Sequence, residues 1–188
     1  MKSPHVVRSS VVKILALLLM ALGTACDDGG GSGEAAPATS NTEDVTSTEL
    51  TDLRYMREEE KLARDVYRAL SQRHGTQMFA NIAASEQTHM DALSGLLRRY
   101  GATDSAPAEG RFTIPELAAL YPALVARGQT SEAEALGVGA DIERLDIADL
   151  DKAIARTSRA DILAVYQRLR QGSENHLRAF TGGGGRGR

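Results

Sequence analysis

Residues 79–100 read FANIAASEQTHMDALSGLLRRY, and this stretch decides the fold. Steps of three and four along it predict a helix with one apolar face, because such steps bring side chains to one side of a helix. Two polar residues, Glu86 and His89, interrupt that face. A buried carboxylate needs a partner, so we expect both side chains to be paired with other polar groups or with metal. The stripe consists of Phe79, Ile82, Glu86, His89, Leu93, Leu96 and Tyr100.

The last helical stretch carries a related pattern. The same steps over residues 162–180 select an apolar stripe that is interrupted by Ser173 and His176. Ser173-x-x-His176 therefore takes the place that Glu86-x-x-His89 holds in the earlier stripe. The spacing is the same, but a serine replaces the glutamate. This stripe consists of Ile162, Tyr166, Leu169, Ser173, His176 and Phe180.

The first long helix also has a carboxylate on its inward stripe. Its pattern predicts a helix over residues 49–74, ended by Gly75, a residue that favours the left-handed conformation of a C-terminal cap. Glu60 lies on the apolar stripe, whereas the directions of Glu58 and Glu59 point around the helix toward solvent. The stripe consists of Leu53, Met56, Glu60, Ala63, Tyr67 and Leu70.

A third inward carboxylate is expected in the helix predicted over residues 131–145. Glu143 shares a line with apolar neighbours along this helix. Asp146, followed by Asp149, is typical of a cap that opens another short helix, here ending near Arg156. Asp146 is therefore interpreted as structural rather than as a ligand. The line consists of Leu136, Ala140, Glu143 and Ile147.

The lengths of the connections predict how these helices are arranged. A short link joins the first helix to the second, so the two should be antiparallel neighbours. Residues 102–128 are long enough to return the chain to the other end, with a short helix starting near Pro115 and Thr113 as its cap. The third helix should then run parallel to the second, and the fourth begins after Thr157 or Ser158. We expect an all-α four-helix bundle with a long crossover between helices 2 and 3 and short extra helices.

Residues 1–25 read as an export signal, with positive charges followed by an apolar run over residues 14–22 that is too short to span a bilayer. The only cysteine, Cys26, follows residues 22–25, which resemble the lipobox of bacterial lipoproteins, in which the cysteine is lipidated. Gly23 stands where that pattern has a large aliphatic residue, so ordinary signal-peptidase cleavage with a free thiol is the alternative. Lipidation at Cys26 is favoured because it explains the lone cysteine of an exported chain.

The remaining chain divides by composition. Residues 26–48 are rich in small and acidic residues and are expected to form a flexible tether, residues 49–181 have the length of one domain, and residues 182–188 are expected to form a disordered Gly/Arg tail. The protein is thus predicted to be exported to the cell envelope, with a lipid anchor as its only contact with the membrane. A formal net charge of -3 without a basic stripe argues against nucleic acid as a partner. One cysteine excludes disulfide scaffolds and four-cysteine iron–sulfur clusters.

The inward polar residues form a candidate set of five metal ligands: Glu60, Glu86, His89, Glu143 and His176. Three carboxylates and two neutral imidazoles carry three negative charges, which a dry core does not tolerate. Two divalent ions convert this to one positive charge, which a hydroxide or oxide bridge would neutralise, whereas one ion leaves one negative charge. Two ions are favoured, although one ion and a protonated carboxylate is the alternative. Oxygen and imidazole ligands suit iron or manganese, and zinc also fits.

The ligand spacing resembles that of the ferritin-like superfamily, and especially its rubrerythrin branch. More closely, four segments resemble an uncharacterised bacterial family named domain of unknown function 2202, and the likeness covers residues 49–181. The segments are YMREEEKLARDVY (55–67), SEQTHMD (85–91), DIADL (146–150) and NHLRAF (175–180). The resemblance implies a ferritin-like bundle with a metal site, but it does not indicate which activity the protein has. Ser173 departs from the superfamily, which has a second glutamate there.

Two functions follow from these expectations. The first is a di-iron or iron–manganese oxidoreductase that reacts with dioxygen or peroxide at the open position beside Ser173, as a ferroxidase or peroxidase does. Tyr67, two turns from Glu60, is either a packed core residue or a donor to the site. The second is a non-catalytic bundle that uses metal for stability or storage, or that binds a protein partner.

Overall fold

The computed structural model describes residues 45–105 and 107–182, and within these ranges the chain forms five helices and no strand. The predicted all-α class is confirmed. The predicted signal, Cys26, most of the tether and residues 183–188 of the tail lie outside the described residues, and export and lipidation stay predictions. No helix in the described ranges is long and apolar enough to cross a membrane. The helices are α2 (Ser47–His74), α3 (Gln77–Arg99), α4 (Pro115–Gly128), α5 (Glu132–Ala155) and α6 (Ala160–Phe180).

Local capping explains where α2 begins and ends. Thr46 caps its first turn by accepting a hydrogen bond from the Glu49 backbone N–H at 3.1 Å, and the Glu49 carboxylate accepts one from the Thr46 N–H at 2.9 Å. This capping box starts the helix at Ser47, within the segment predicted to be tether. At the other end Gly75 has φ 67°, as expected for a left-handed C-terminal cap.

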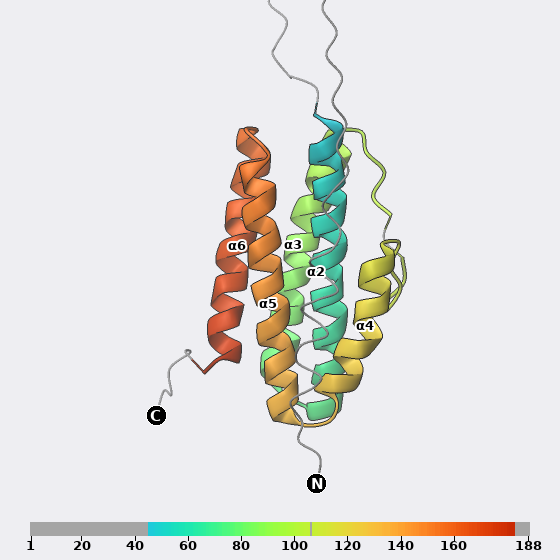
Figure 1. Cartoon of the computed structure of the whole chain (residues 1–188), viewed down its shortest axis with the longest axis vertical. Coiled ribbons are helices and arrows are strands. Elements are labelled where there is room, and N and C mark those ends of the chain that lie inside the picture. Colours follow the sequence, from blue (N-terminus) through green and yellow to red (C-terminus); the bar gives the residue numbers. More distant parts are fainter. Residues whose placement is uncertain (1–44, 106, 183–188) are drawn as a thin grey trace, which may run out of the picture. The chain divides into compact units, whose positions relative to one another are not determined.

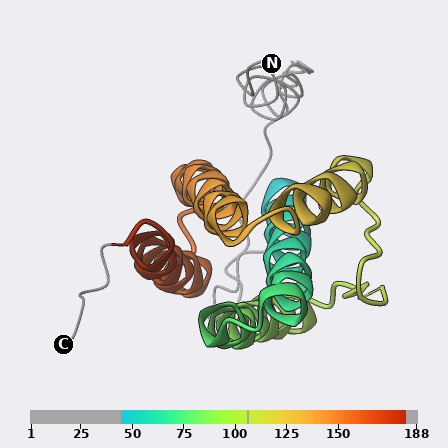
Figure 2. The ribbon, with the colours of Figure 1, turned by 90° about the horizontal axis from the view of Figure 1, so that it is seen from below.

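Four of the helices pack in a closed ring. Figures 1 and 2 show α2 beside α3 and α5 beside α6, and α2 also packs on α5 while α3 packs on α6. The start of α5 lies near the end of α2, because His74 Nε2 is 2.8 Å from the carbonyl oxygen of Gly128. The end of α5 lies near the start of α2, because the Thr157 hydroxyl donates to Glu49 at 2.6 Å. As predicted, α5 therefore runs parallel to α3.

The crossover runs along the outside of α2 (Figure 1), where α4 packs against α2 and α5. The side chain of Lys61 is fully buried beneath it and donates to the carbonyl oxygens of Ala108 and Arg111 at 3.0 and 2.9 Å. Its charge is balanced by Asp65, 2.6 Å away. These interactions satisfy loop carbonyls that would otherwise be costly to bury.

The prediction of Thr113 as the cap of α4 was wrong, and Glu58 instead binds the backbone just before this helix. It accepts hydrogen bonds from the backbone N–H groups of Thr113 and Ile114 at 2.9 and 3.1 Å, just before α4 begins at Pro115. Ile114 is the N-cap residue. The expectation that Glu58 faces solvent was wrong, because the crossover covers this side of α2.

Two apolar clusters lie above and below a polar layer in the four-helix ring. The residues that belong to the layer separate the clusters along every one of the four helices. The first cluster includes Leu62, Val66, Tyr67, Phe79, Ile82, Val138, Ile142 and Phe180. The second includes Leu53, Met56, Leu93, Leu97, Leu150, Ile162, Tyr166 and Leu169. The layer between them contains Glu60, Glu86, His89, Glu143, Asp146, Ser173 and His176.

Candidate metal centre

The five residues predicted as ligands are all buried and lie close together. They form two groups, in each of which two carboxylates and one imidazole can present ligand atoms within 4.8 Å of one another. The first group is Glu60, Glu86 and His89, and the second is Glu86, Glu143 and His176. Glu86 belongs to both. Each of the four ring helices contributes at least one of these residues.

The carboxylate of Glu86 faces both imidazoles. Its Oε2 lies 2.8 Å from Nδ1 of His89, and its Oε1 lies 2.9 Å from Nδ1 of His176. The spacing of three residues on α3 brings Glu86 beside His89, whereas His176 arrives from α6. The two imidazole rings are stacked, with centroids 5.8 Å apart. One carboxylate thus connects two potential metal positions.

The remaining carboxylates approach from α2 and α5. Glu60 Oε2 is 3.1 Å from Nδ1 of His89, and Glu143 Oε1 is 3.6 Å from Nδ1 of His176. The Tyr67 hydroxyl donates a hydrogen bond to Glu143 Oε1 at 2.7 Å. Its ring packs on Phe180, with centroids 5.2 Å apart. Tyr67 is therefore both a core residue and a group that orients Glu143.

Tyr67→Phe should loosen Glu143 without removing a ligand. Losing this hydrogen bond is expected to lower the free energy of unfolding of the metal-free protein by about 1 kcal/mol. It should also weaken binding of one metal ion by about 10-fold, because residues that orient ligands commonly have effects of this size. Urea denaturation and metal titration measure the two effects. Unchanged affinity would show that Glu143 needs no orientation by Tyr67.

Several ligand atoms approach one another without the alignment of hydrogen bonds. Both Glu86 oxygens, Oε1 of Glu60 and Nδ1 of His176 are buried and have no hydrogen-bond partner among the described residues. Buried polar atoms are rarely left unpaired, and each unpaired one is costly. Oxygen and nitrogen atoms that converge in this way fit a divalent cation that takes carboxylate and imidazole ligands.

Asp146 differs from its predicted role. It lies in the middle of α5, a single helix from Glu132 to Ala155, and its buried side chain accepts a hydrogen bond from the Ser173 hydroxyl. The interpretation of Asp146 as a cap that opens a second short helix was therefore wrong. The helix continues because no glycine or proline interrupts it here and because the Asp146 side chain turns into the ring instead of capping the backbone.

Glu59 was expected to face solvent but is also buried. Neither of its oxygens has a hydrogen-bond partner among the described residues. Burial raises the pKa of Glu59 well above its ordinary value, and the charges of Asp146 and Asp149 raise it further. In its protonated form Glu59 can donate a hydrogen bond to Asp149. The single-stripe reading failed because α2 is covered by α3, α4 and α5, so more than one of its faces is buried.

In the metal-free protein the imidazoles and carboxylates shift one another's pKa values. Burial opposes the charged form of His89, but Glu60 and Glu86 raise its pKa to about 11. Burial likewise opposes the charged form of His176, but Glu143 and Glu86 raise its pKa to about 9. Burial alone would raise the pKa of Glu86, yet the two imidazoles hold it to about 2. Without metal, Glu86 is thus an anion between two cations.

Two other carboxyl groups are shifted in the opposite direction. Burial raises the pKa of Glu143 to about 8, although His176 partly opposes the shift. Burial raises the pKa of Asp146 to about 7, although the hydrogen bond from Ser173 partly opposes it. The metal-free site therefore retains protons that bound metal ions would displace.

The metal-free protein should lose stability as the pH rises from 6 to 9. The imidazoles have pKa values above the ordinary 6.5, so their stabilisation is present below that value and is lost toward about 9 and 11. The raised pKa values of Glu143 and Asp146 act in the same direction. Thermal melts of chelator-treated protein across this range test the sign. A melting temperature that increases with pH would contradict it.

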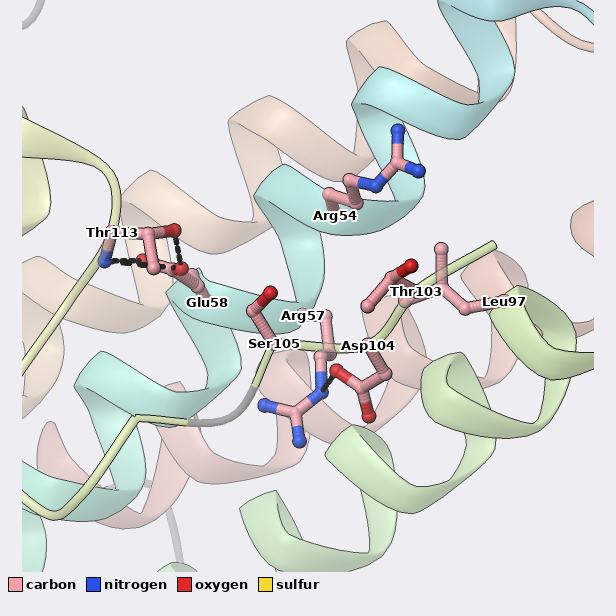
Figure 3. Close-up of a pocket in the computed structure, with 8 residues that line it drawn as sticks. All are labelled: Arg54, Arg57, Glu58, Leu97, Thr103, Asp104, Ser105 and Thr113. Atoms are coloured by element: carbon pink, nitrogen blue, oxygen red, sulfur yellow. Dashed lines mark hydrogen bonds and ion pairs between the residues drawn. The ribbon is translucent and has the colours of Figure 1, made fainter. Parts of the chain in front are cut away.

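A pocket on another face of α2 has a different character. Figure 3 shows it between α2, the end of α3 and the loop before α4. Its buried arginine, Arg57, pairs with Asp104 at 2.6 Å, and Glu58 is occupied by the backbone of Thr113. No histidine lines it. The pocket is therefore separate from the acid–histidine centre, which consists of the two groups formed by Glu60, Glu86, His89, Glu143 and His176.

Comparisons with known proteins agree with this architecture. The chain is 50% identical over 139 residues to uncharacterized protein MJ0754 of Methanocaldococcus jannaschii, a match that covers 73% of this chain and 75% of that protein. It also superposes on the crystal structure of hypothetical protein MJ0754, with a TM-score of 0.71 and 48% identity over 78% of this chain and 83% of that one. This relative comes from an archaeon, whereas the family resembled by the sequence was expected to be bacterial.

The family comparison covers the five helices except the first two residues of α2. Residues 49–185 match the family described as uncharacterized protein domain (DUF2202). The match includes all four segments that carry the resemblance in the sequence, together with every residue of the acid–histidine centre. The chain belongs to this DUF2202 family.

Proposed function

We propose that this protein binds two metal ions, iron or iron with manganese, in a ferritin-like four-helix bundle and reacts there with dioxygen or peroxide. The observation that carries the proposal is Glu86, whose two oxygens face two separate histidines at 2.8 and 2.9 Å. A carboxylate in this position can bridge two cations. The ferritin-like assignment is supported by the four-helix ring and by one long crossover between α3 and α5.

The ligand roles follow from the two groups. Glu60 and His89 would hold one ion, Glu143 and His176 would hold the other, and Glu86 would contact both. All three carboxylates are nearly inaccessible to water, which strengthens their interaction with cations. Zinc would satisfy the same ligands, but it has no redox chemistry.

Two ferrous ions at these positions would supply two electrons, which reduce one dioxygen to hydrogen peroxide when two protons are taken up from solvent. The residues of the chain hold the ions and exclude bulk water. Glu143 and Asp146 have pKa values of about 8 and 7 in the metal-free protein, so ion binding near neutral pH would release protons from this layer. Tyr67 keeps Glu143 in place through its 2.7 Å hydrogen bond.

Anaerobic loading with ferrous iron, followed by air or peroxide, tests the proposal. We expect two irons per chain and a new near-ultraviolet absorption that develops faster than iron oxidises in buffer. Glu60→Ala and His89→Ala should abolish this reaction. The control is Asp91→Asn, a change at an exposed position of α3 that lies outside the polar layer.

A non-catalytic role for the metal is the second candidate. It is favoured by the position of the polar layer, where ions would connect all four ring helices. Metal would then raise the melting temperature, and the Glu60 and His89 variants would lose that increase, but no oxidation would exceed the rate in buffer. Absence of bound metal would contradict both functions.

A further inference from the structure

The second glutamate that the sequence lacks at Ser173 has a counterpart on the neighbouring helix. Ser173 is buried on α6, and its hydroxyl donates to Oδ2 of Asp146 on α5. The other oxygen of Asp146, Oδ1, is also buried and has no hydrogen-bond partner. A buried carboxylate oxygen without a partner is costly, so this atom is stabilised either by a proton or by a bound cation.

Asp146 lies in the same buried layer as the first group, although its oxygens are not among the ligand atoms that lie within 4.8 Å of one another there. Gly172, next to Ser173, is so close to His89 that a Cβ atom on it would be 2.6 Å from His89 Nε2. The part of α6 that contains Ser173 thus passes close to the histidine of the first group. Among the neighbouring charges, that of Asp146 raises the pKa of Glu60 the most, and Glu60 is another member of this group.

The charge of the complete centre also favours a role for Asp146. Glu60, Glu86, Glu143 and Asp146 provide four carboxylates, which two divalent ions would neutralise when both histidines are neutral. Without Asp146 the same centre would keep one positive charge, which a bound hydroxide or oxide would have to neutralise. Four carboxylates and two histidines are also the ligand set of di-iron bundles, in which two helices each supply a Glu-x-x-His pair.

We propose that Asp146 is a fourth carboxylate ligand, bound to the ion held by Glu60, Glu86 and His89, and that Ser173 positions it. This inference rests on the proposed metal centre. The α5 helix would supply the carboxylate that α6 does not carry at Ser173. Ser173 itself is a positioning residue, because its hydroxyl acts through Asp146.

Cobalt(II) titration of the full chain, followed by visible absorption, tests this assignment. Wild-type protein should bind two ions, and Asp146→Asn should weaken one of them by about 10- to 100-fold. Its cobalt spectrum should also change, because the spectrum depends on coordination number. Asp149→Asn is the matched control, since Asp149 is one turn further along α5, and it should leave the spectrum unchanged.

An exchange of the two side chains separates metal ligation from a structural role. The double variant Asp146→Ser with Ser173→Glu moves the carboxylate to α6 and should recover binding of the ion held by Glu60, Glu86 and His89. Ser173→Ala keeps the carboxylate but removes its hydrogen bond, so it should weaken the same ion by about 10-fold. This variant decides the question even if Asp146→Asn does not fold, because a purely structural Asp146 would leave cobalt affinity unchanged in Ser173→Ala.

The outcomes distinguish this inference from the proposed function. Wild-type protein that binds no cobalt and no iron would contradict the proposed centre, and the inference with it. Wild-type protein that binds two ions, with unchanged affinity and spectrum in Asp146→Asn, would contradict only the assignment of Asp146. Recovery in the exchanged double variant supports both.

Discussion

Glu86→Gln is expected to abolish binding of both metal ions. The substitution retains the size of the side chain but removes the charge that faces His89 and His176 at 2.8 and 2.9 Å. Because Glu86 belongs to both ligand groups, its loss affects two positions, whereas loss of Glu60 or Glu143 affects one directly. Metal analysis after anaerobic loading should fall from two ions per chain to nearly none, and the increase in melting temperature caused by metal should disappear.

The stability of the metal-free form checks that the Glu86 variant is folded. Without the Glu86 charge, the pKa values of His89 and His176 should fall, because this carboxylate helps to raise both. Glu174→Gln on α6 is a suitable control, since Glu174 is partly exposed and pairs with Arg170 instead of facing the centre. Two tightly bound ions in a folded Glu86→Gln protein would show that the groups do not depend on a shared carboxylate.

Gly172→Ala should have the largest effect of any single methyl addition near the centre. The new Cβ would lie 2.6 Å from both Cε1 and Nε2 of His89. The imidazole is rigid and its other nitrogen faces Glu60 and Glu86, so it cannot move without disturbing the ligands. Overpacking of this kind is expected to cost about 1–3 kcal/mol of unfolding free energy. The ion bound by His89 should also be weakened.

Gly95→Ala provides the opposite result within the same bundle. Gly95 lies in α3, and a Cβ atom there would meet nothing within 4 Å. Alanine is favoured over glycine inside a helix by up to about 1 kcal/mol, so this variant should be more stable than wild type. Urea denaturation of the two metal-free variants measures both effects. Equal effects would mean that the contact between Gly172 and His89 is not restrictive.

Much of the fold could be predicted because each helix has clear local signals. Gly75 ends α2 in the left-handed conformation, and the stripe from Phe79 to Tyr100 identifies the inward face of α3. The five predicted ligands were found because polar residues at regular core positions need partners. The structure brings these five side chains together, although their role as metal ligands stays a prediction.

Asp146 and Glu59 were missed for two physical reasons. Aspartate is a common helix cap, so the residue type favoured that role for Asp146. Its actual environment depends on Ser173, a residue 27 positions away. A step of three from Glu143 and a step of four to Leu150 did contain the signal, since all three are buried on one line. Glu59 could not be placed by a single stripe, because helix periodicity does not show how many neighbours cover a helix.

The polar layer between the two apolar clusters has a consequence for how the bundle opens. In the metal-free protein, each cluster can loosen from its own end while the other remains packed, because a layer of ionisable groups separates them. Such partial opening appears in amide hydrogen exchange as groups of residues with different protection. Bound ions would attach all four helices at mid-height, and the two halves should then exchange as one cooperative unit.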